Sequence, residues 1–302
     1  MLRIKACTVV LFIFLIITAV TVAGTRVNAT EPMVLAHPER VGIGQPFLVR
    51  LTSDQAFDRI LIHWMDQEFA PSVSQWNGHH VAIAMLGTDV LTIKPGRQKF
   101  IVRAWAGGKE TVLHRSVKII GRTYPRQELS LPSKMVTPPT VELERIKAER
   151  ARTQKAKKTW SDQRLWRLPF HRPVEGSFTS VYGLQRVLNG TPKNPHRGVD
   201  FRAPVGTAVE AVAEGRVILV ESHYYAGNSI YIDHGNGVIS LYFHLSDFDV
   251  SPGDIVKRGQ VIGRAGSTGR ATGPHLHLSI SVQGQLVDPV PLFEKTSDQL
   301  LR

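Results

Sequence analysis

Hydrophobic and polar positions divide the chain into two strand-rich regions separated by a charged segment. In the first region, short apolar or alternating runs are bounded by turn residues, a pattern typical of β-strands. These runs span residues 46–51, 60–64, 81–85, 99–105 and 111–120. The last two flank Gly107 and Gly108, which favour a tight hairpin turn. We therefore predict a small β-sandwich, immunoglobulin-like in outline, over residues 30–123.

A proline-containing stretch and then a charged segment follow this region. Residues 130–139 include Pro132, Pro138 and Pro139 and should form an extended connector. Residues 141–160 lack glycine and proline, and their glutamates precede their lysines, which suits a helix and its dipole. We predict a Pro-rich connector and a solvated, charged linker helix over residues 124–168. A nucleic-acid-binding arm is the less favoured alternative, and we expect no nucleic-acid partner.

The second strand-rich region has recurrent turn glycines between β-branched runs. The runs span residues 216–220, 229–232, 238–242 and 275–282, and no long amphipathic helix intervenes. This pattern predicts an antiparallel all-β domain, which we assign to residues 169–302. The chain as a whole is thus expected to be mainly β.

The N-terminus predicts export. Arg3 and Lys5 precede residues 6–23, which carry no charge, as in a signal peptide. The uncharged run is also long enough to span a bilayer, so cleavage and anchoring in the inner membrane both stay open for residues 1–29. We expect a periplasmic or cell-envelope location. Cys7, the only cysteine, lies inside this leader, which excludes a disulfide or a cysteine nucleophile in the mature chain.

The charge balance points to an anionic partner. The formal net charge is +12 and the isoelectric point is near 10. Such a balance favours contact with nucleic acid, a membrane or an acidic cell-wall matrix, and charge by itself does not choose among them.

Histidines and one aspartate form three local clusters in the second region. His275 and His277 are two residues apart, so on a strand both face the same way, and one could bind a metal while the other handles its bound water. His244 stands alone. His196 and Asp200 would be about 13 Å apart in extended chain, whereas ligands of one metal must approach within about 4 Å. We expect a bend at Gly198 to bring them together, since Pro195 and Pro204 argue against a helix.

Two imidazoles and one carboxylate leave a fourth coordination position vacant, which is typical of a catalytic zinc site. Such a site needs a general base, and the chain has no His-Glu-x-x-His segment to supply one. Histidine can take this role because its ordinary pKa lies near neutrality. The candidates are His244 and His275.

Residues 170–291 closely resemble the LytM/lysostaphin-type zinc metalloendopeptidases. The resemblance rests on Ser180-Val181-Tyr182-Gly183, His196-Arg197-Gly198-Val199-Asp200-Phe201, Tyr242-Phe243-His244-Leu245, Gly266-Ser267-Thr268-Gly269 and Gly273-Pro274-His275-Leu276-His277. It implies that His196, Asp200 and His277 hold one Zn²⁺ and that His244 and His275 are catalytic. Phe243 departs from the family, which often has glycine or alanine there. His79 and His80 are expected in a surface loop, and His171, His223 and His234 are expected to be structural.

The resemblance implies a zinc-dependent endopeptidase that hydrolyses peptide bonds of bacterial peptidoglycan, in cross-links or stem peptides. The alternative is a non-catalytic wall-binding regulator that activates another cell-wall hydrolase. A third reading is a zinc peptidase acting on an exported protein. The sequence carries no signal for oligomeric state, for the bond that is cut, or for occlusion of the site by the N-terminal domain.

Overall fold

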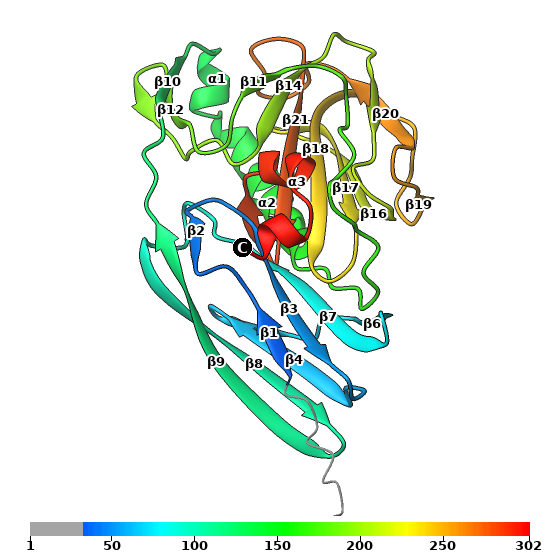
Figure 1. Cartoon of the computed structure of the whole chain (residues 1–302). Helices are drawn as coiled ribbons and strands as arrows, with labels where there is room; N and C mark the ends of the chain where they lie inside the picture. Colours follow the sequence, from blue (N-terminus) through cyan, green and yellow to red (C-terminus); the bar gives the residue numbers. More distant parts are fainter. Residues whose placement is uncertain (1–32) are drawn as a thin grey trace, which may run out of the picture. The chain divides into compact units, whose positions relative to one another are not determined.

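Strands are the main regular elements of the computed structural model, which describes residues 33–302 (Figure 1). The leader predicted at residues 1–29 lies outside this range. No helix among the described residues is long and apolar enough to cross a membrane. The described residues belong to one compact unit, so the domain boundaries near residues 123 and 168 stay a prediction.

Two sheets pack about a common core in the N-terminal part. The first sheet has the order β1-β3-β7-β6 and the second the order β2-β9-β8-β4-β5. Buried Phe47, Trp64, Phe100 and Ile119 are among the apolar residues that both sheets contribute to one core, which confirms the predicted sandwich. The strands are β1 (Val34–Ala36), β2 (Arg40–Gly42), β3 (Phe47–Ser53), β4 (Arg59–Trp64), β5 (Gln67–Phe69), β6 (Val73–Trp76), β7 (His79–Leu86), β8 (Gly96–Ala106) and β9 (Lys109–Ile120).

The turn between β8 and β9 confirms the predicted hairpin. Ala106 pairs with Lys109, so only two residues form the loop. Gly107 and Gly108 have φ angles of 57° and 74°. Positive φ at both loop positions is the requirement of a type I′ turn, and glycine meets it without steric strain.

The connector is more structured than the sequence predicts. It contains β10 (Arg126–Leu129), helix α1 (Ser133–Val136) and the 3₁₀ turn η1 (Thr140–Glu142). β10 pairs in parallel with β12 (Gln185–Leu188) of the following region. The side chain of Asn189 accepts from the Leu131 N–H and donates to the Leu131 carbonyl. These contacts between distant parts of the chain, which no local pattern encodes, hold the connector in place.

Helix α2 (Leu143–Lys157) confirms the predicted linker helix. Most of its residues are exposed, as expected of a solvated helix, while Glu149 and Lys157 are buried. Arg152 on α2 forms an ion pair with Glu221 of β16 (Gly215–His223), and Thr153 bonds to Tyr231 of β17 (Gly227–Asp233). The helix therefore contacts the second region along one face and exposes the rest to solvent.

A ten-stranded sheet, whose pairings are all antiparallel, forms the second region and confirms the predicted fold class. Its main order is β11-β14-β21-β18-β17-β16-β19, and β15, β20 and β22 pair off this path. The remaining elements are β11 (Phe178–Ser180), β13 (Thr191–Pro192), β14 (Val199–Arg202), β15 (Ala208–Glu210), β18 (Val238–Phe248), β19 (Ile255–Val256), β20 (Val261–Ala265), β21 (His275–Val282), β22 (Gln285–Val287), α3 (Val290–Glu294) and η2 (Asp298–Leu300).

The pairing of three strands places the histidine clusters together. β21 lies between β14 and β18. In the register of these pairs Asp200 stands opposite His277, and His277 stands opposite Phe243. Residues that are far apart in sequence therefore meet on adjacent strands, held there by the ladder of backbone hydrogen bonds.

Candidate metal centre and adjoining cavity

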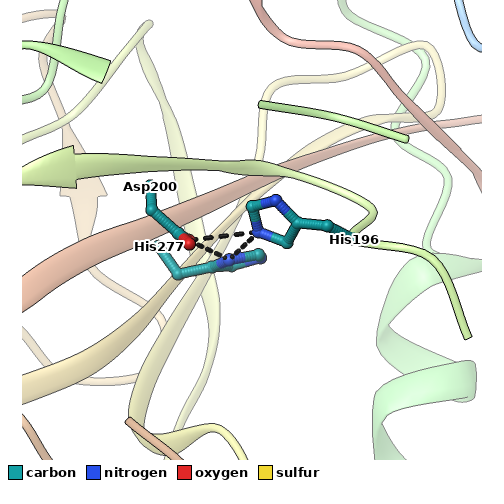
Figure 2. A group of neighbouring side chains, drawn as sticks. All are labelled: His196, Asp200 and His277. Carbon is teal, nitrogen blue, oxygen red and sulfur yellow. Dashed lines mark hydrogen bonds and ion pairs between the residues drawn. The ribbon is translucent and has the colours of Figure 1, made fainter. Parts of the chain in front are cut away.

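His196, Asp200 and His277 converge on one point (Figure 2). Asp200 Oδ1 lies 2.7 Å from His277 Nδ1 and 3.1 Å from His196 Nε2. The two histidine nitrogens are 2.9 Å apart. All three residues are buried. The structure thus brings together the three residues that the sequence predicts as ligands.

Gly198 explains how His196 and Asp200 approach each other. The chain bends at Gly198, immediately before β14 begins. A Cβ atom at this position would lie 2.6 Å from His277 Nε2 and 2.4 Å from the Leu278 carbonyl oxygen. These distances are shorter than real Cβ contacts allow, so the bend needs glycine because of the close approach of β21.

Hydrogen bonds to the far nitrogen of each ring set the tautomers of the two histidines. His196 Nδ1–H donates to the Val181 carbonyl at 2.9 Å, which leaves Nε2 with a lone pair. Ser279 Oγ–H donates to the Arg197 carbonyl, so the hydroxyl oxygen accepts from His277 Nε2–H at 2.8 Å. His277 Nδ1 therefore also carries a lone pair. Such outer partners orient metal-binding histidines.

The resulting donor set fits a metal ion. His196 Nε2, His277 Nδ1 and Asp200 Oδ1 lie 2.7–3.1 Å from one another. In the tautomers assigned above, neither of these two nitrogens carries a proton. Lone pairs at this distance repel unless a cation lies between them. Catalytic zinc sites typically have three protein ligands, and two imidazoles with one carboxylate are a common set.

The electrostatics of the site favour a charged Asp200 and a neutral His277. Burial raises the pKa of Asp200, but the contacts of its carboxylate with His196 and His277 outweigh burial and hold this pKa well below the usual value. Asp200 Oδ2 also accepts from Arg186 at 3.1 Å. Burial lowers the pKa of His277 to about 4, against the opposing effect of Asp200. Both groups therefore have the protonation state that a metal ligand needs.

His244 and His275 lie beside this group. Their ring centroids are 4.7 Å apart, and His275 Nε2 is 3.9 Å from Asp200 Oδ1. His244 Nδ1–H donates to the Thr268 carbonyl, and His275 Nδ1–H donates to the Gly273 carbonyl, each at 2.8 Å. Each ring keeps an Nε2 lone pair for chemistry.

The backbone at His244 is unusual. Its φ is 64°, in the left-handed region that a residue with a side chain rarely adopts. The register between β17 and β18 shifts around this position, and the His244 N–H donates to the Ala226 carbonyl outside the regular ladder. Burial, followed by the charges of His275 and His277, lowers the pKa of His244 to about 3, so the ring is neutral near pH 7. Such local strain is common at functional sites.

Phe243, the departure from the family pattern, packs on a candidate ligand. Its ring lies parallel to that of His277, with centroids 5.2 Å apart and planes 2° from parallel. This stack covers one face of the His277 ring, while Asp200 contacts the ring at Nδ1.

A cavity of about 260 Å³ adjoins the site. His244, His275 and Asp200 contribute to its wall, as do Arg186 and Arg270. The connector supplies Gln127, Leu129 and Leu131. The segment that the sequence predicts as a simple spacer is therefore part of the wall of this cavity.

The N-terminal sandwich also supports the site. Asp89, which is buried, accepts from Arg197 at 3.1 Å and from the Leu286 N–H at 3.1 Å. The Arg197 carbonyl accepts from Ser279, which in turn holds His277. A continuous chain of hydrogen bonds thus runs from the sandwich to one of the three converging side chains.

The remaining histidines lie elsewhere. His79 and His80 begin strand β7 and are not in the surface loop we expected, because β7 extends to pair with β6, and His79 contacts Asp54 at 2.5 Å. His234 is fully buried with both ring nitrogens hydrogen-bonded, to Glu214 and Ser240. His171 pairs with Glu210, and His223 with Ser229.

Sequence reasoning missed several supporting residues. Ser279 follows His277 by two positions, and strand alternation could have placed it on the same face. Nothing local in the sequence marks Asp89, Arg186 or Arg270, because each reaches the site only through tertiary contacts.

Comparison with known proteins places these observations in one family. The model of peptidase family M23 matches residues 194–289. The chain is 48% identical over 94 residues to the peptidoglycan DD-endopeptidase ShyA of Vibrio cholerae, which is 31% of this chain and 22% of that protein. It is 37% identical over 124 residues to lysostaphin of Staphylococcus simulans, which is 39% of this chain and 25% of that protein. The match thus spans a quarter or less of these two relatives.

A solved structure matches much more of the chain. The crystal structure of a putative peptidase M23 from Pseudomonas aeruginosa is 30% identical and superposes with a TM-score of 0.61. The match covers 81% of this chain and 92% of that chain. It therefore extends well beyond the residues that the family model covers.

Proposed function

Because this chain belongs to peptidase family M23, we propose that it is a zinc-dependent endopeptidase that hydrolyses peptide bonds in bacterial peptidoglycan. His196, Asp200 and His277 would hold one zinc ion. His244 and His275 would be the catalytic bases. The names of relatives such as the peptidoglycan DD-endopeptidase ShyA support peptidoglycan as the substrate.

One observation carries this proposal. The lone pairs of His196 Nε2, Asp200 Oδ1 and His277 Nδ1 converge at 2.7–3.1 Å, while His244 and His275 keep Nε2 lone pairs beside them. A purely structural cluster would satisfy these nitrogens with donors from the protein. A hydrolase needs this combination of a metal-binding group and adjacent bases.

Zinc in such a site supplies Lewis acidity, which acidifies water and polarises the scissile carbonyl group. The protein contributes the proton transfers. His275 Nε2, at 3.9 Å from Asp200 Oδ1, is placed to accept a proton from the attacking water. The neutral His244 ring, held by the Thr268 carbonyl, offers a hydrogen-bond acceptor beside it, and protonated His275 can return the proton to the leaving amine.

We also propose that the protein works in the cell envelope, exported by its N-terminal segment, either cleaved or retained as an anchor. Its net charge of +12 supports this location, because peptidoglycan carries carboxylates. This charge would hold the enzyme on its polymeric substrate.

Digestion of purified peptidoglycan tests the function. The zinc-loaded protein should release fragments that mass spectrometry identifies, and a chelator should stop the release until zinc is restored. His196→Ala should release no fragments and bind less zinc. His171→Gln, which changes a histidine paired with Glu210 outside the site, is the matched control and should behave like the wild type.

The same experiment distinguishes the alternatives. A wild-type protein that binds zinc and peptidoglycan but releases no fragments would be a wall-binding regulator. If the protein cleaves an exported protein but leaves peptidoglycan intact, it would be a zinc peptidase with a protein substrate. Fragments that persist in His196→Ala would show that the assigned ligands are wrong.

A further inference from the structure

The cavity beside the candidate metal centre has an excess of positive charge. Among the described residues that line it, Asp200 is the one acid, and it already contacts His196, His277 and Arg186. Two arginines, Arg186 and Arg270, line the same cavity. Asp200 forms an ion pair with Arg186, so Arg270 has no partner of opposite charge among the described residues of the cavity wall.

Arg270 belongs to the segment between β20 and β21 that also carries the His244 partner Thr268. Its guanidinium lies over the Tyr225 ring, 4.5 Å from the centroid. Its backbone N–H donates to the Tyr225 carbonyl, which fixes the base of the side chain. The group is thus preorganised at the cavity wall.

No carboxylate of residues 33–302 forms an ion pair with Arg270. Burial lowers its pKa, Tyr225 opposes this effect, and the charge of Arg186 adds to it. The other cavity arginine, Arg186, contacts Asp200, and the nearby Arg197 contacts Asp89. A partly buried arginine that lines a cavity and has no carboxylate partner of its own is expected to bind an anion there, since its planar donors match a carboxylate.

We infer that Arg270 is a specificity residue that binds a free carboxylate on the substrate residue next to the scissile bond. The inference rests on the proposed peptidase function and narrows its substrate class. The enzyme would prefer cross-links in which a diamino acid keeps a free carboxylate beside the bond that is cut. Uncharged glycine bridges would be poor substrates, because they offer nothing to balance Arg270.

Two synthetic cross-link peptides test this assignment. One carries a free carboxylate on the diamino acid at the scissile bond, and the other carries a carboxamide at the same place. The zinc-loaded wild type should cleave the carboxylate peptide with a kcat/KM about 10- to 100-fold higher, the range expected for a hydrogen bond between charged groups. In Arg270→Gln this ratio should fall to about one, and Arg270→Lys should restore part of it.

Arg216→Gln is the matched control, because Arg216 lies on β16 outside the cavity and donates to the Gly253 carbonyl. It should keep the wild-type ratio. Zinc content and thermal unfolding, measured for each variant, identify any that fail to fold. A wild type that cleaves both peptides equally, or an Arg270→Gln variant that keeps the preference, would overturn the assignment.

Equilibrium binding separates this inference from the proposed function. If the wild type cleaves neither peptide, the peptidase function fails. Calorimetric titration of the same peptides then still tests Arg270. If the wild type binds the carboxylate peptide more tightly and Arg270→Gln loses this preference, the role of Arg270 is supported. Equal binding of the two peptides by the wild type refutes it.

Discussion

The sandwich and the second β-region are both antiparallel for the most part, yet they bury different kinds of side chain. In the described sandwich strands and loops the buried polar residues are Ser53, Thr88 and Asp89. The second region buries many more, among them His196, Asp200, His223, His234, His244, His277, Ser279 and Asp288. Burial of a polar group is unfavourable unless it is hydrogen-bonded, so a dense polar interior requires a reason.

That reason differs between the two regions. In the second region several of the buried polar groups belong to the candidate metal centre, where Ser279 orients His277. In the sandwich, buried Asp89 reaches outward to Arg197 beside His196. The comparison indicates that the sandwich reaches the site through buried Asp89, while the rest of its interior is mainly apolar.

Removal of the site's carboxylate should have the largest effect. Asp200→Asn keeps the size of the side chain but removes the charge that holds His196 and His277, and it leaves Arg186 unpaired. We expect cleavage of peptidoglycan to fall by at least about 10³-fold and zinc content to fall with it. Fragment release and metal analysis measure these losses. Full activity in this variant would mean that Asp200 is not a ligand.

Asp89→Asn tests whether the sandwich really supports the centre. The change weakens the bond to Arg197 and so loosens the chain of contacts to His277. We expect zinc affinity, measured by competition with a chelator, to fall about 10- to 100-fold. Asp54→Asn, at an exposed ion pair of the same sandwich, should leave it unchanged. Equal zinc affinity in the two variants would show that the sandwich does not affect zinc binding through Asp89.

Gly198→Ala tests the close approach of the bend to β21. The added methyl group would overlap His277 Nε2 and the Leu278 carbonyl. We expect the free energy of unfolding to fall by about 1–3 kcal/mol, together with weaker zinc binding. Gly121→Ala in the sandwich is the control, since its Cβ would meet Pro95 at an ordinary 3.4 Å. Denaturant titration compares the two, and equal stability would contradict the packing argument.

Ser279→Ala should have the smallest effect of the four. It removes the acceptor that orients His277 Nε2–H, so zinc affinity should fall about tenfold while the fold is retained. Ser281→Ala is matched to it: Ser281 lies two residues further along the same strand and its buried Oγ has no hydrogen-bond partner among the described residues. Chelator competition should show no loss for Ser281→Ala. A similar loss of zinc affinity in both variants would show that the packing of β21, and not the hydrogen bond to His277, causes the loss.

Much of the fold and part of the site could be predicted from local sequence. The long strands follow from apolar alternation, the β8–β9 hairpin from Gly107 and Gly108, and α2 from helix propensity. The bend at Gly198 was required to bring His196 and Asp200 together, and it is present. The short strands β1, β2, β5 and β6 could not be predicted, because two- to four-residue strands depend on the partner with which they pair.

The sequence by itself determined the chemical groups and their local spacing, since strand alternation and a glycine bend act over a few residues. Only the tertiary structure decided which nitrogen of each histidine is free, which arginine lacks a partner, and that the connector lines the cavity. These features depend on contacts between residues far apart in the chain, such as Asp89 with Arg197 and His196 with His277. Such contacts form only when the strands pair in register, and no pattern within a single segment specifies them.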